Sequence, residues 1–543
     1  MAACWAGLVY PASAQEKVNV PVLRAELDSV RAALRIPGMA VALRQGDAVL
    51  LETGLGYADL ENRVKATAAT SFRVASITKT FTSTLLMQLV EQGKLSLDAP
   101  ISAYAVDLGD PRITVRHLLT HTSEGEPGTH FQYNGYRYGR LGPVMEKAAG
   151  KPFYELLMEN IVLPLRLRST APGLSLPSYF DYIQRRKAVR PYFNNAFRYL
   201  AKPYELNARG EVVPTQYLNE FGAFGGLTTT VGDLLRYSTA LDQHRFVTAA
   251  TQQQIFTPNR TRTGVATPYG LGWYTQTYQG LDLYWHYGQT PGESGLLVKV
   301  PARQLTFVVL ANTDKLSQPF PLGDGDLFTS PLGQLLYKYV LNADAGFAAV
   351  NYHRPVAAIE AELAAAGPGP HRAFYNRELI TQAALALVGQ DTVRAQQFYA
   401  AYGRLNFHSV PTAGPAGDVL AAIWQVGINR TLTQDFSLPA PARIRVEGVG
   451  ENCSGDFSSW CDYGAIEDTA GKVVWQMPGQ PARHAGGAQK NQRVSQVITL
   501  PAGRYRLRYT SDGGHAFNRW DSAPPEGFLW GIGLYREPTG TSR

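Results

Sequence analysis

Residues 72–101 read FRVASITKTFTSTLLMQLVEQGKLSLDAPI, and this stretch carries the pattern that decides the fold. After Ser76, apolar side chains return every three or four positions, which predicts an amphipathic helix that Gly93 ends. The apolar positions are Phe81, Leu85, Leu86, Leu89 and Val90. Ser76 and Lys79 stand three residues apart where this helix begins, and therefore on one helix face. We expect a hydroxyl and an amine to lie together at a helix N-terminus.

This pair suits nucleophilic catalysis. The backbone N–H groups beside Ser76, unpaired at a helix start, can stabilise an oxyanion. Burial of Lys79 in an otherwise apolar helix would favour its neutral form, and a serine hydroxyl needs such a base to react. Taken alone, S-x-x-K more often marks an N-capping serine and a surface lysine. The interpretation therefore depends on the rest of the chain.

Four further segments accompany the Ser76 helix along the chain. They are PGMAV at 37–41, ITVRHLLTHTSE at 113–124, GGL at 225–227 with Thr229 and Asp233, and YGLGW at 269–273. Over residues 22–342 the chain resembles the serine β-lactamase-related family, which includes class C β-lactamases, DD-peptidases and family VIII esterases. Glu124 stands where that family's HLLTHTSG has its glycine. The resemblance implies an α+β fold, with an antiparallel sheet flanked by helices and a helical subdomain.

The resemblance assigns a second motif, Y-x-N, to the segment FQYNGYRYGRLG at 131–142. Tyr133 takes the tyrosine position and could act as general base with Lys79. Asn134 stands where serine or alanine is usual, and Gly135 replaces the asparagine, which favours ester hydrolysis over β-lactam or peptide turnover. Tyr136 is an alternative register, and a plain core aromatic is the non-functional alternative for Tyr133.

A third motif, H-x-G, lies in YWHYGQTPGESGLLVKV at 284–300. By resemblance His286 polarises the site and orients substrate, and the backbone N–H of Gln289 joins that of Ser76 as the oxyanion hole. Gly288 would let the strand approach the substrate closely. H-x-G is typical of the esterase and peptidase branches, and a satisfied core histidine is the alternative.

The whole sequence predicts four parts. Residues 22–342 are the expected hydrolase domain, one part precedes it and two follow it. Residues 1–14 match a signal peptide with its Ala-Ser-Ala end, although no basic residue precedes the apolar stretch. Residues 343–430 are Ala-rich and predict a helical linker with a helical hairpin. Residues 435–540 predict a β-sandwich, as in the alternating strand 504–509, with His and Trp clusters that suit either a glycan ligand or the core.

Cysteine usage favours an exported protein. Cys453 and Cys461 form an even pair in a loop-like segment, which predicts a local disulfide, with two free thiols as the alternative. Export to the periplasm or out of a bacterial cell is therefore expected. No stretch approaches the ~18 apolar residues of a membrane span.

The composition excludes few functions. The net charge is +7, and no run of five or six like charges indicates nucleic-acid binding. The chemistry requires no metal or other cofactor.

We predict a serine hydrolase that acts through an acyl-enzyme on a small-molecule or peptide substrate: a β-lactam, a D-amino-acid peptide or an ester. Cell-wall peptide or glycan are further candidate partners. The alternative is a penicillin-binding or sensor-like protein with little turnover, which Gly135 favours.

Overall fold

The structure, a computed structural model, describes most of the chain in several ranges. These are residues 18–173, 176–207, 209–278, 281–341, 354–359, 361, 381–388, 419–424, 426–427, 429–452, 460–484, 491–512 and 530–536. The expected signal peptide, the hairpin beyond residue 388, Cys453 and the clusters at 513–521 lie outside the described residues. Among the described residues, no helix combines the length and the hydropathy needed to cross a bilayer.

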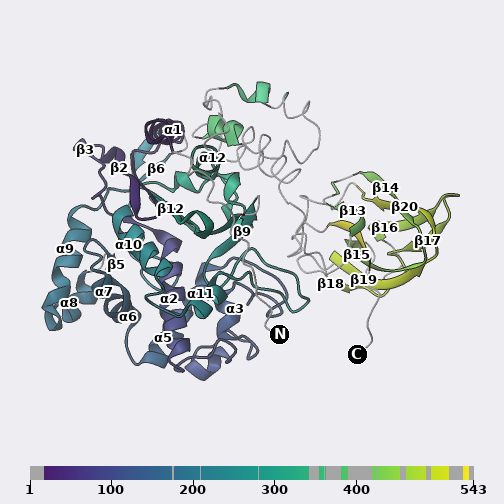
Figure 1. Cartoon of the computed structure of the whole chain (residues 1–543), viewed down its shortest axis with the longest axis horizontal. Coiled ribbons are helices and arrows are strands. Elements are labelled where there is room, and N and C mark those ends of the chain that lie inside the picture. The colour runs from purple at the N-terminus through teal and green to yellow at the C-terminus, as the bar shows by residue number, and fades with distance from the viewer. Residues whose placement is uncertain are drawn as a thin grey trace, which may run out of the picture.

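A seven-stranded antiparallel sheet forms the centre of the first part of the chain (Figure 1). Its order is β3 (Val64–Lys65), β2 (Ala48–Asp59), β1 (Gly38–Gln45), β12 (Leu305–Ala311), β11 (Glu293–Val300), β10 (Leu281–Thr290) and β9 (Tyr274–Tyr278). Two hairpins that the sequence predicts, around residues 45–47 and 301–304, are confirmed. The sheet thus joins strands from both ends of this part.

The sheet buries both of its faces. On β1, Met39 and Val41 belong to a core with α1 (Val20–Ala33) and α12 (Pro331–Leu336), whereas Ala40 and Ala42 belong to another with α2 (Thr78–Glu91) and α10 (Val231–Asp242). This alternation follows from the two-residue period of a strand. Helices therefore cover both faces, and the predicted α+β class is confirmed.

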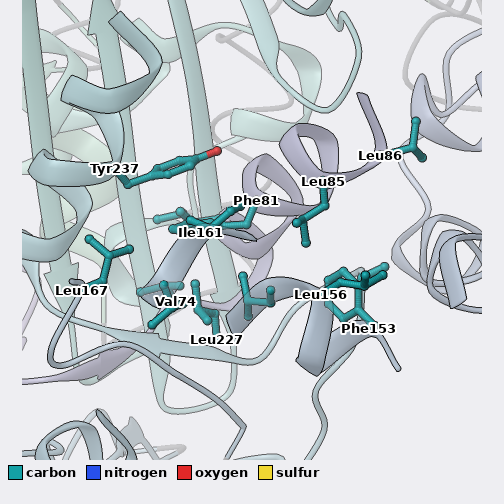
Figure 2. Close-up of a cluster of buried hydrophobic side chains, with 14 of the residues drawn as sticks. Val74, Phe81, Leu85, Leu86, Phe153, Leu156, Ile161, Leu167, Leu227 and Tyr237 are labelled. Atoms are coloured by element: carbon teal, nitrogen blue, oxygen red, sulfur yellow. The ribbon is translucent and has the colours of Figure 1, made fainter. Parts of the chain in front are cut away.

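Shorter helices and strands complete the first part of the chain. They are α3 (Val115–Leu119), α4 (Gly135–Gly139), α5 (Leu141–Ala149), α6 (Phe153–Leu157), α7 (Leu163–Leu165), α8 (Leu176–Arg185), α9 (Arg190–Arg198), α11 (Ala249–Phe256), β4 (Phe72–Arg73), β5 (Ala171–Pro172), β6 (Tyr204–Leu206), β7 (Val212–Pro214) and β8 (Leu227–Thr229). Among them, α5, α6 and α11 contact α2. Figure 2 shows the apolar cluster under α2. There Phe81 stacks on Tyr237 with ring centres 3.9 Å apart, which anchors the helix that carries Lys79.

The C-terminal part is an all-β body, as predicted. In the part of this region that the structure describes, nine strands form one nearly closed sheet: β13 (Val419–Trp424), β14 (Thr431–Leu438), β15 (Ala442–Asn452), β16 (Trp460–Asp468), β17 (Val473–Gln476), β18 (Arg483–His484), β19 (Asn491–Leu500), β20 (Gly503–Thr510) and β21 (Gly531–Arg536). β13 and the start of β14 precede the predicted boundary at 435. Cys461 is disulfide-bonded.

Two described helical pieces of the predicted linker belong to the first part. Residues 356–359 and 381–387 are helical, and Ile359, Ala383 and Leu387 lie in the same core as α1 and α12. These pieces therefore extend the core of the first part beyond residue 342.

Candidate active site

The nucleophile turn, so called because it carries the predicted nucleophile Ser76, joins a short strand to α2. Directly after β4 and Val74, the 3-10 turn η1 (Ala75–Ile77) holds Ala75 at a positive φ of 41°. Residues other than glycine rarely adopt a positive φ. Such a backbone conformation persists only where surrounding contacts hold it. Here the Thr78 hydroxyl donates to Ala75 O at 2.7 Å and accepts from Leu227 N at 3.1 Å. Ala75 and Ile77 are buried while Ser76 is half-buried, so the turn presents Ser76 alone.

Lys79 lies one turn into the helix and faces Ser76. Its Nζ is 2.8 Å from Ser76 Oγ and 2.6 Å from the carbonyl oxygen of Phe224. The side chain is 1% exposed, and burial lowers the pKa of Lys79 to about 7. An amine in this state loses its proton near neutral pH and can accept one from a serine hydroxyl.

Tyr133 lies beside this pair, and Tyr136 does not. The Tyr133 ring centre is 5.1 Å from Lys79 Nζ. Burial raises the pKa of Tyr133 well above its usual value, and the nearby Ser76 hydroxyl lowers it in part. Among the described residues, Tyr133 Oη has no partner at hydrogen-bonding geometry. Tyr136 is 69% exposed and pairs with Arg140.

The two residues after Tyr133 have different surroundings. Asn134 caps α4, accepting from Arg137 N at 3.0 Å, and its amide donates to Glu124, the residue at the usual glycine position. A Cβ on Gly135 would lie 3.9 Å from Lys79 Nζ. A side chain at 135 would therefore start next to the amine, and glycine leaves that space empty of protein atoms.

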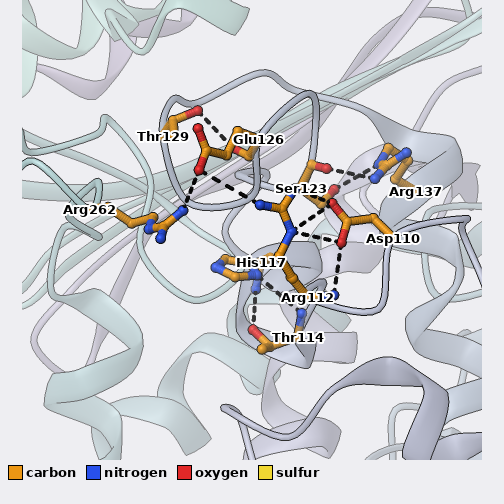
Figure 3. Close-up of polar contacts among 9 residues, drawn as sticks. All are labelled: Asp110, Arg112, Thr114, His117, Ser123, Glu126, Thr129, Arg137 and Arg262. Atoms are coloured by element: carbon orange, nitrogen blue, oxygen red, sulfur yellow. Dashed lines mark hydrogen bonds and ion pairs between the residues drawn. The ribbon is translucent and has the colours of Figure 1, made fainter.

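Polar contacts hold the loop that carries Tyr133 (Figure 3). Arg137 donates to Ser123 Oγ at 2.9 Å and to Ser123 O at 2.6 Å. Arg262, far along the chain, pairs with Glu126 at 2.8 Å. These contacts fix the loop between α3 and α4 over the nucleophile helix.

His286 is buried in a cluster of aromatic rings. A carbonyl oxygen only accepts, so His286 Nδ1 donates to Tyr287 O at 2.7 Å, and Nε2 accepts from the Tyr269 hydroxyl at 2.8 Å. Burial lowers the pKa of His286 to about 3, with a further contribution from Lys79. The ring is neutral, and its centre lies 6.2 Å from that of Tyr133.

Gly288 brings β10 against the nucleophile turn. A Cβ there would lie 2.2 Å from Val74 O, so the missing side chain is required for this strand to pack on the turn. Gln289 follows it opposite Ser294, and β9 pairs with β10 only as far as Trp285. Residues 286–290 therefore form a strand edge beyond β9, next to Ser76.

Two contributors escaped the sequence analysis. The Phe224 carbonyl, which holds Lys79, has no side-chain signature, and its position directly before GGL is the one signal that could have found it. His121, in the segment at 113–124, lies against Tyr133 with ring centres 4.2 Å apart and the ring planes tilted by 32°, and it accepts from Asn134 N at 3.1 Å. Its pKa is lowered well below the usual value by burial, then by Lys79 and His286. His121 therefore holds the Tyr133 loop as a neutral ring.

Among the described residues, one cluster of three acidic side chains could hold a cation, and it lies in the β body. Oxygens of Glu451, Asp462 and Asp512 lie within 4.8 Å of one another. Asp462 accepts from Trp530 Nε1 at 2.8 Å and from Asp512 N at 2.9 Å. Both oxygens of Asp462 thus serve the fold of the β body.

Comparisons with known proteins concern the first part of the chain. A family model described as beta-lactamase matches residues 23–325, which include all the residues predicted for the site. Penicillin-binding protein 4* of Bacillus subtilis is 24% identical over 322 residues, covering 51% of this chain and 68% of that protein. The D-aminopeptidase of Gluconobacter oxydans is 23% identical over 332 residues, covering 53% of this chain and 58% of that protein.

Solved structures match this part of the chain at similar identity, with TM-scores below 0.5. The octameric penicillin-binding protein homologue from Pyrococcus abyssi superposes with a TM-score of 0.48 at 24% identity, covering 55% of this chain and 74% of that chain. The D-amino acid amidase from Ochrobactrum anthropi gives 0.44 at 22% identity, covering 54% and 91%.

Proposed function

The chain belongs to the β-lactamase family, and on that premise we propose that it is a serine hydrolase forming an acyl-enzyme on Ser76. The observation that supports this most is the 2.8 Å contact between Ser76 Oγ and Lys79 Nζ, since the pKa of that amine is about 7. The substrate is an amide or ester carbonyl compound: a D-amino-acid peptide, a β-lactam or a carboxylic ester. The D-aminopeptidase relative supports the first of these.

Acylation begins with neutral Lys79. One N–H donates to Phe224 O, which orients the nitrogen lone pair towards Ser76. As Ser76 Oγ bonds to the carbonyl carbon, its proton passes to Lys79 Nζ. The backbone N–H groups of Ser76 and Gln289 stabilise the oxyanion. When the bond to the leaving group breaks, Tyr133 gives its proton to the leaving atom and regains one from Lys79.

Deacylation reverses these roles. Water attacks the acyl carbon, and its proton passes through Tyr133 and Lys79 to Ser76 Oγ as the serine ester breaks. The neutral His286 contributes by fixing β10 through Tyr269 and Tyr287, and transfers no proton at neutral pH.

A panel of substrates tests this function. A p-nitrophenyl ester, a chromogenic cephalosporin and a D-Ala-D-Ala peptide are assayed with wild type, Ser76→Ala and the exposed control Ser96→Ala. We expect at least one substrate to be hydrolysed by wild type and Ser96→Ala, and lost in Ser76→Ala. A fluorophosphonate probe should label only proteins that keep Ser76. Equal rates in all three proteins would exclude the proposal.

One observation favours a second function, a penicillin-binding or sensor-like protein. Gly135 provides no amide beside Lys79 to hold a substrate amide group. In this case the cephalosporin would acylate Ser76 in a single stoichiometric burst without turnover. Intact-protein mass spectrometry separates this outcome from steady hydrolysis.

Export is part of the proposal. The disulfide at Cys461 supports an oxidising compartment, such as the periplasm or the cell exterior. There, cell-wall peptide would be an accessible substrate, and the β body could bind glycan.

A further inference from the structure

Basic side chains gather on α8 and α9, which pack against each other at one margin of the first part of the chain (Figure 1). Residues 163–199 contain seven basic residues and one acidic residue, Asp181, so this segment has a net charge of +6, whereas the whole chain has +7. All seven basic residues are exposed: Arg166, Arg168, Arg185, Arg186, Lys187, Arg190 and Arg198. One short segment therefore carries nearly all of the net positive charge of the chain.

Helical spacing turns the basic side chains of α9 outward. Tyr192, Phe193 and Ala196 are buried in the core of the first part. Arg190 and Arg198 stand eight residues apart, which is two steps of four and therefore one helix face, and both are exposed. The face of α9 that looks away from the core is therefore basic.

The neighbouring segments extend this face. The α8 residues Tyr179, Tyr182 and Ile183 are buried, so Arg185 lies on the opposite, exposed side of the helix. The residues from 186 to 189 join α8 to α9 and add two exposed charges. The Arg168 carbonyl oxygen accepts from Asn195 Nδ2 at 3.3 Å, which places the segment after α7 beside α9. We call the seven basic residues together the basic face.

Ion pairs neutralise only part of the basic face. Arg185 pairs with Glu155 at 3.0 Å, and Arg186 pairs with Glu159 at 2.7 Å. Four basic side chains make no ion pair with any described residue: Arg166, Arg168, Lys187 and Arg190. A surface with this excess of positive charge attracts a polyanion or an anionic membrane.

Two exposed aromatic side chains accompany the basic residues. Phe180, on the exposed side of α8, is 58% exposed, and Tyr199, directly after α9, is 49% exposed. The Arg198 guanidinium lies 5.4 Å from the centre of the Tyr199 ring. A soluble polyanion offers a phenyl ring no apolar surroundings, whereas the interface of a bilayer accepts aromatic rings and basic groups together. The combination favours a membrane.

We propose that the basic face binds the surface of a membrane that contains anionic phospholipids. Its guanidinium and amine groups contact the phosphate headgroups, and Phe180 enters the boundary between the headgroups and the acyl chains. The contact is peripheral and is independent of the proposed chemistry at Ser76.

Sedimentation of the whole chain with vesicles tests this proposal. Vesicles of phosphatidylcholine alone are compared with vesicles that also contain phosphatidylglycerol. We expect wild type to bind the anionic vesicles at least about tenfold more tightly, and the difference to shrink as salt is added, because salt screens exposed charges. Equal binding to both kinds of vesicle overturns the proposal.

Charge reversal locates the binding surface. In Arg168→Glu/Lys187→Glu/Arg190→Glu, three side chains without ion pairs change sign, and we expect at least about tenfold weaker binding to the anionic vesicles. Circular dichroism checks that the variant keeps its fold.

A matched variant controls for net charge. Arg24→Glu/Lys94→Glu/Arg443→Glu changes the net charge equally at three exposed positions outside residues 163–199, and we expect it to bind as wild type does. An equal loss of binding in the two triple variants overturns the assignment to the basic face.

Removing the phenyl ring separates a membrane from a soluble polyanion. Phe180→Ser keeps every charge and changes an exposed side chain, so the fold does not depend on it. We expect at least about threefold weaker binding to the anionic vesicles, because the ring no longer enters the bilayer, and unchanged binding to polyphosphate. Vesicle binding that Phe180→Ser leaves unchanged overturns the membrane proposal and assigns the basic face to a soluble polyanion.

Discussion

The charge of Lys79 is set by where its side chain lies. It is 1% exposed and contacts Ser76 Oγ and Phe224 O, so its protonated form has lost most of its hydration. Below its pKa of about 7 the amine is charged and cannot accept the Ser76 proton; above it, the amine is neutral. On the proposed mechanism, Lys79 therefore becomes able to accept the Ser76 proton as the pH rises.

We predict that kcat/KM for ester hydrolysis rises with pH and levels off above about pH 7. No falling limb should follow below pH 10, because burial raises the pKa of Tyr133 well above 10.0. A pH–rate profile from pH 5 to 9.5 measures this. The rise in kcat/KM reports the titration of Lys79 and not that of His286, because burial lowers the pKa of His286 to about 3.

Replacing Lys79 provides the control for this profile. Loss of the proton acceptor in Lys79→Met should lower kcat/KM by about 10²–10⁴. A flat wild-type profile, or a variant that keeps both the rate and the limb, would contradict the assignment of Lys79.

At position 135 we predict that Gly135→Asn shifts the preference from esters towards amides. The new Cβ would lie 3.9 Å from Lys79 Nζ, within ordinary contact, so the backbone at 135 accepts a Cβ. One added hydrogen bond to a substrate amide contributes about 1 kcal/mol, or about fivefold in the amide-to-ester kcat/KM ratio. Gly135→Ala, which adds the Cβ without the amide, should leave the ratio unchanged. An equal shift in both variants would indicate a steric effect.

Two strands far apart in the sequence position the nucleophile turn. β4 leads directly into it, and β10 packs on it because Gly288 has no side chain to meet Val74 O. A buried ion pair joins Arg73 of β4 to Glu293 of β11 at 3.2 Å, with side-chain exposures of 1% and 2%. Arg73 also donates to Glu220 O at 2.8 Å, in the segment that leads to Phe224. Arg73 therefore connects three elements: β11 of the sheet, β4 with the turn that follows it, and the segment that leads to Phe224.

We predict that Glu293→Gln lowers the free energy of unfolding by about 3–5 kcal/mol, since it leaves the Arg73 guanidinium buried without its counter-ion. Urea denaturation of wild type and variant measures the loss. Glu126→Gln, which removes exposed pairs with Arg112 and Arg262, should cost at most about 1 kcal/mol. A similar loss of unfolding free energy in both variants would show that burial does not make the Arg73–Glu293 pair more important for stability than the exposed pairs.

The same elements show how far the sequence alone leads. Helical periodicity was enough to place Ser76 and Lys79 on one face, because one turn brings them together. Tyr133 and His286 reach the site only through tertiary packing, so only the resemblance predicted them. The Phe224 carbonyl is a backbone group with no side-chain signature, and it was missed. Gly288 was assigned to substrate approach, whereas its contact with Val74 O became visible only with strand and turn in place.

At the scale of the whole molecule, the described residues form three buried cores. Two share the seven-stranded sheet, on its opposite faces, and the third belongs to the β body and includes Trp460, Trp475 and Trp530. The third core has no residue in common with the other two. Cys461, in β16 of the β body, is disulfide-bonded, and the sequence predicts Cys453 of the same part as its partner. Because each part has its own core, each can unfold as its own cooperative unit.

We therefore predict two thermal transitions, of which only one responds to a reducing agent. A disulfide contributes about 2–4 kcal/mol, so dithiothreitol should lower the midpoint of the β body by several degrees. The transition that accompanies loss of ester hydrolysis should stay in place, because the Ser76 site lies in the other part. Differential scanning calorimetry with parallel activity assays measures both.

Cys461→Ser is the control, and it should show the lowered midpoint of the β body without reductant and no further shift with it. A single transition that moves with reductant, together with the loss of activity, would show that the two parts fold as one unit.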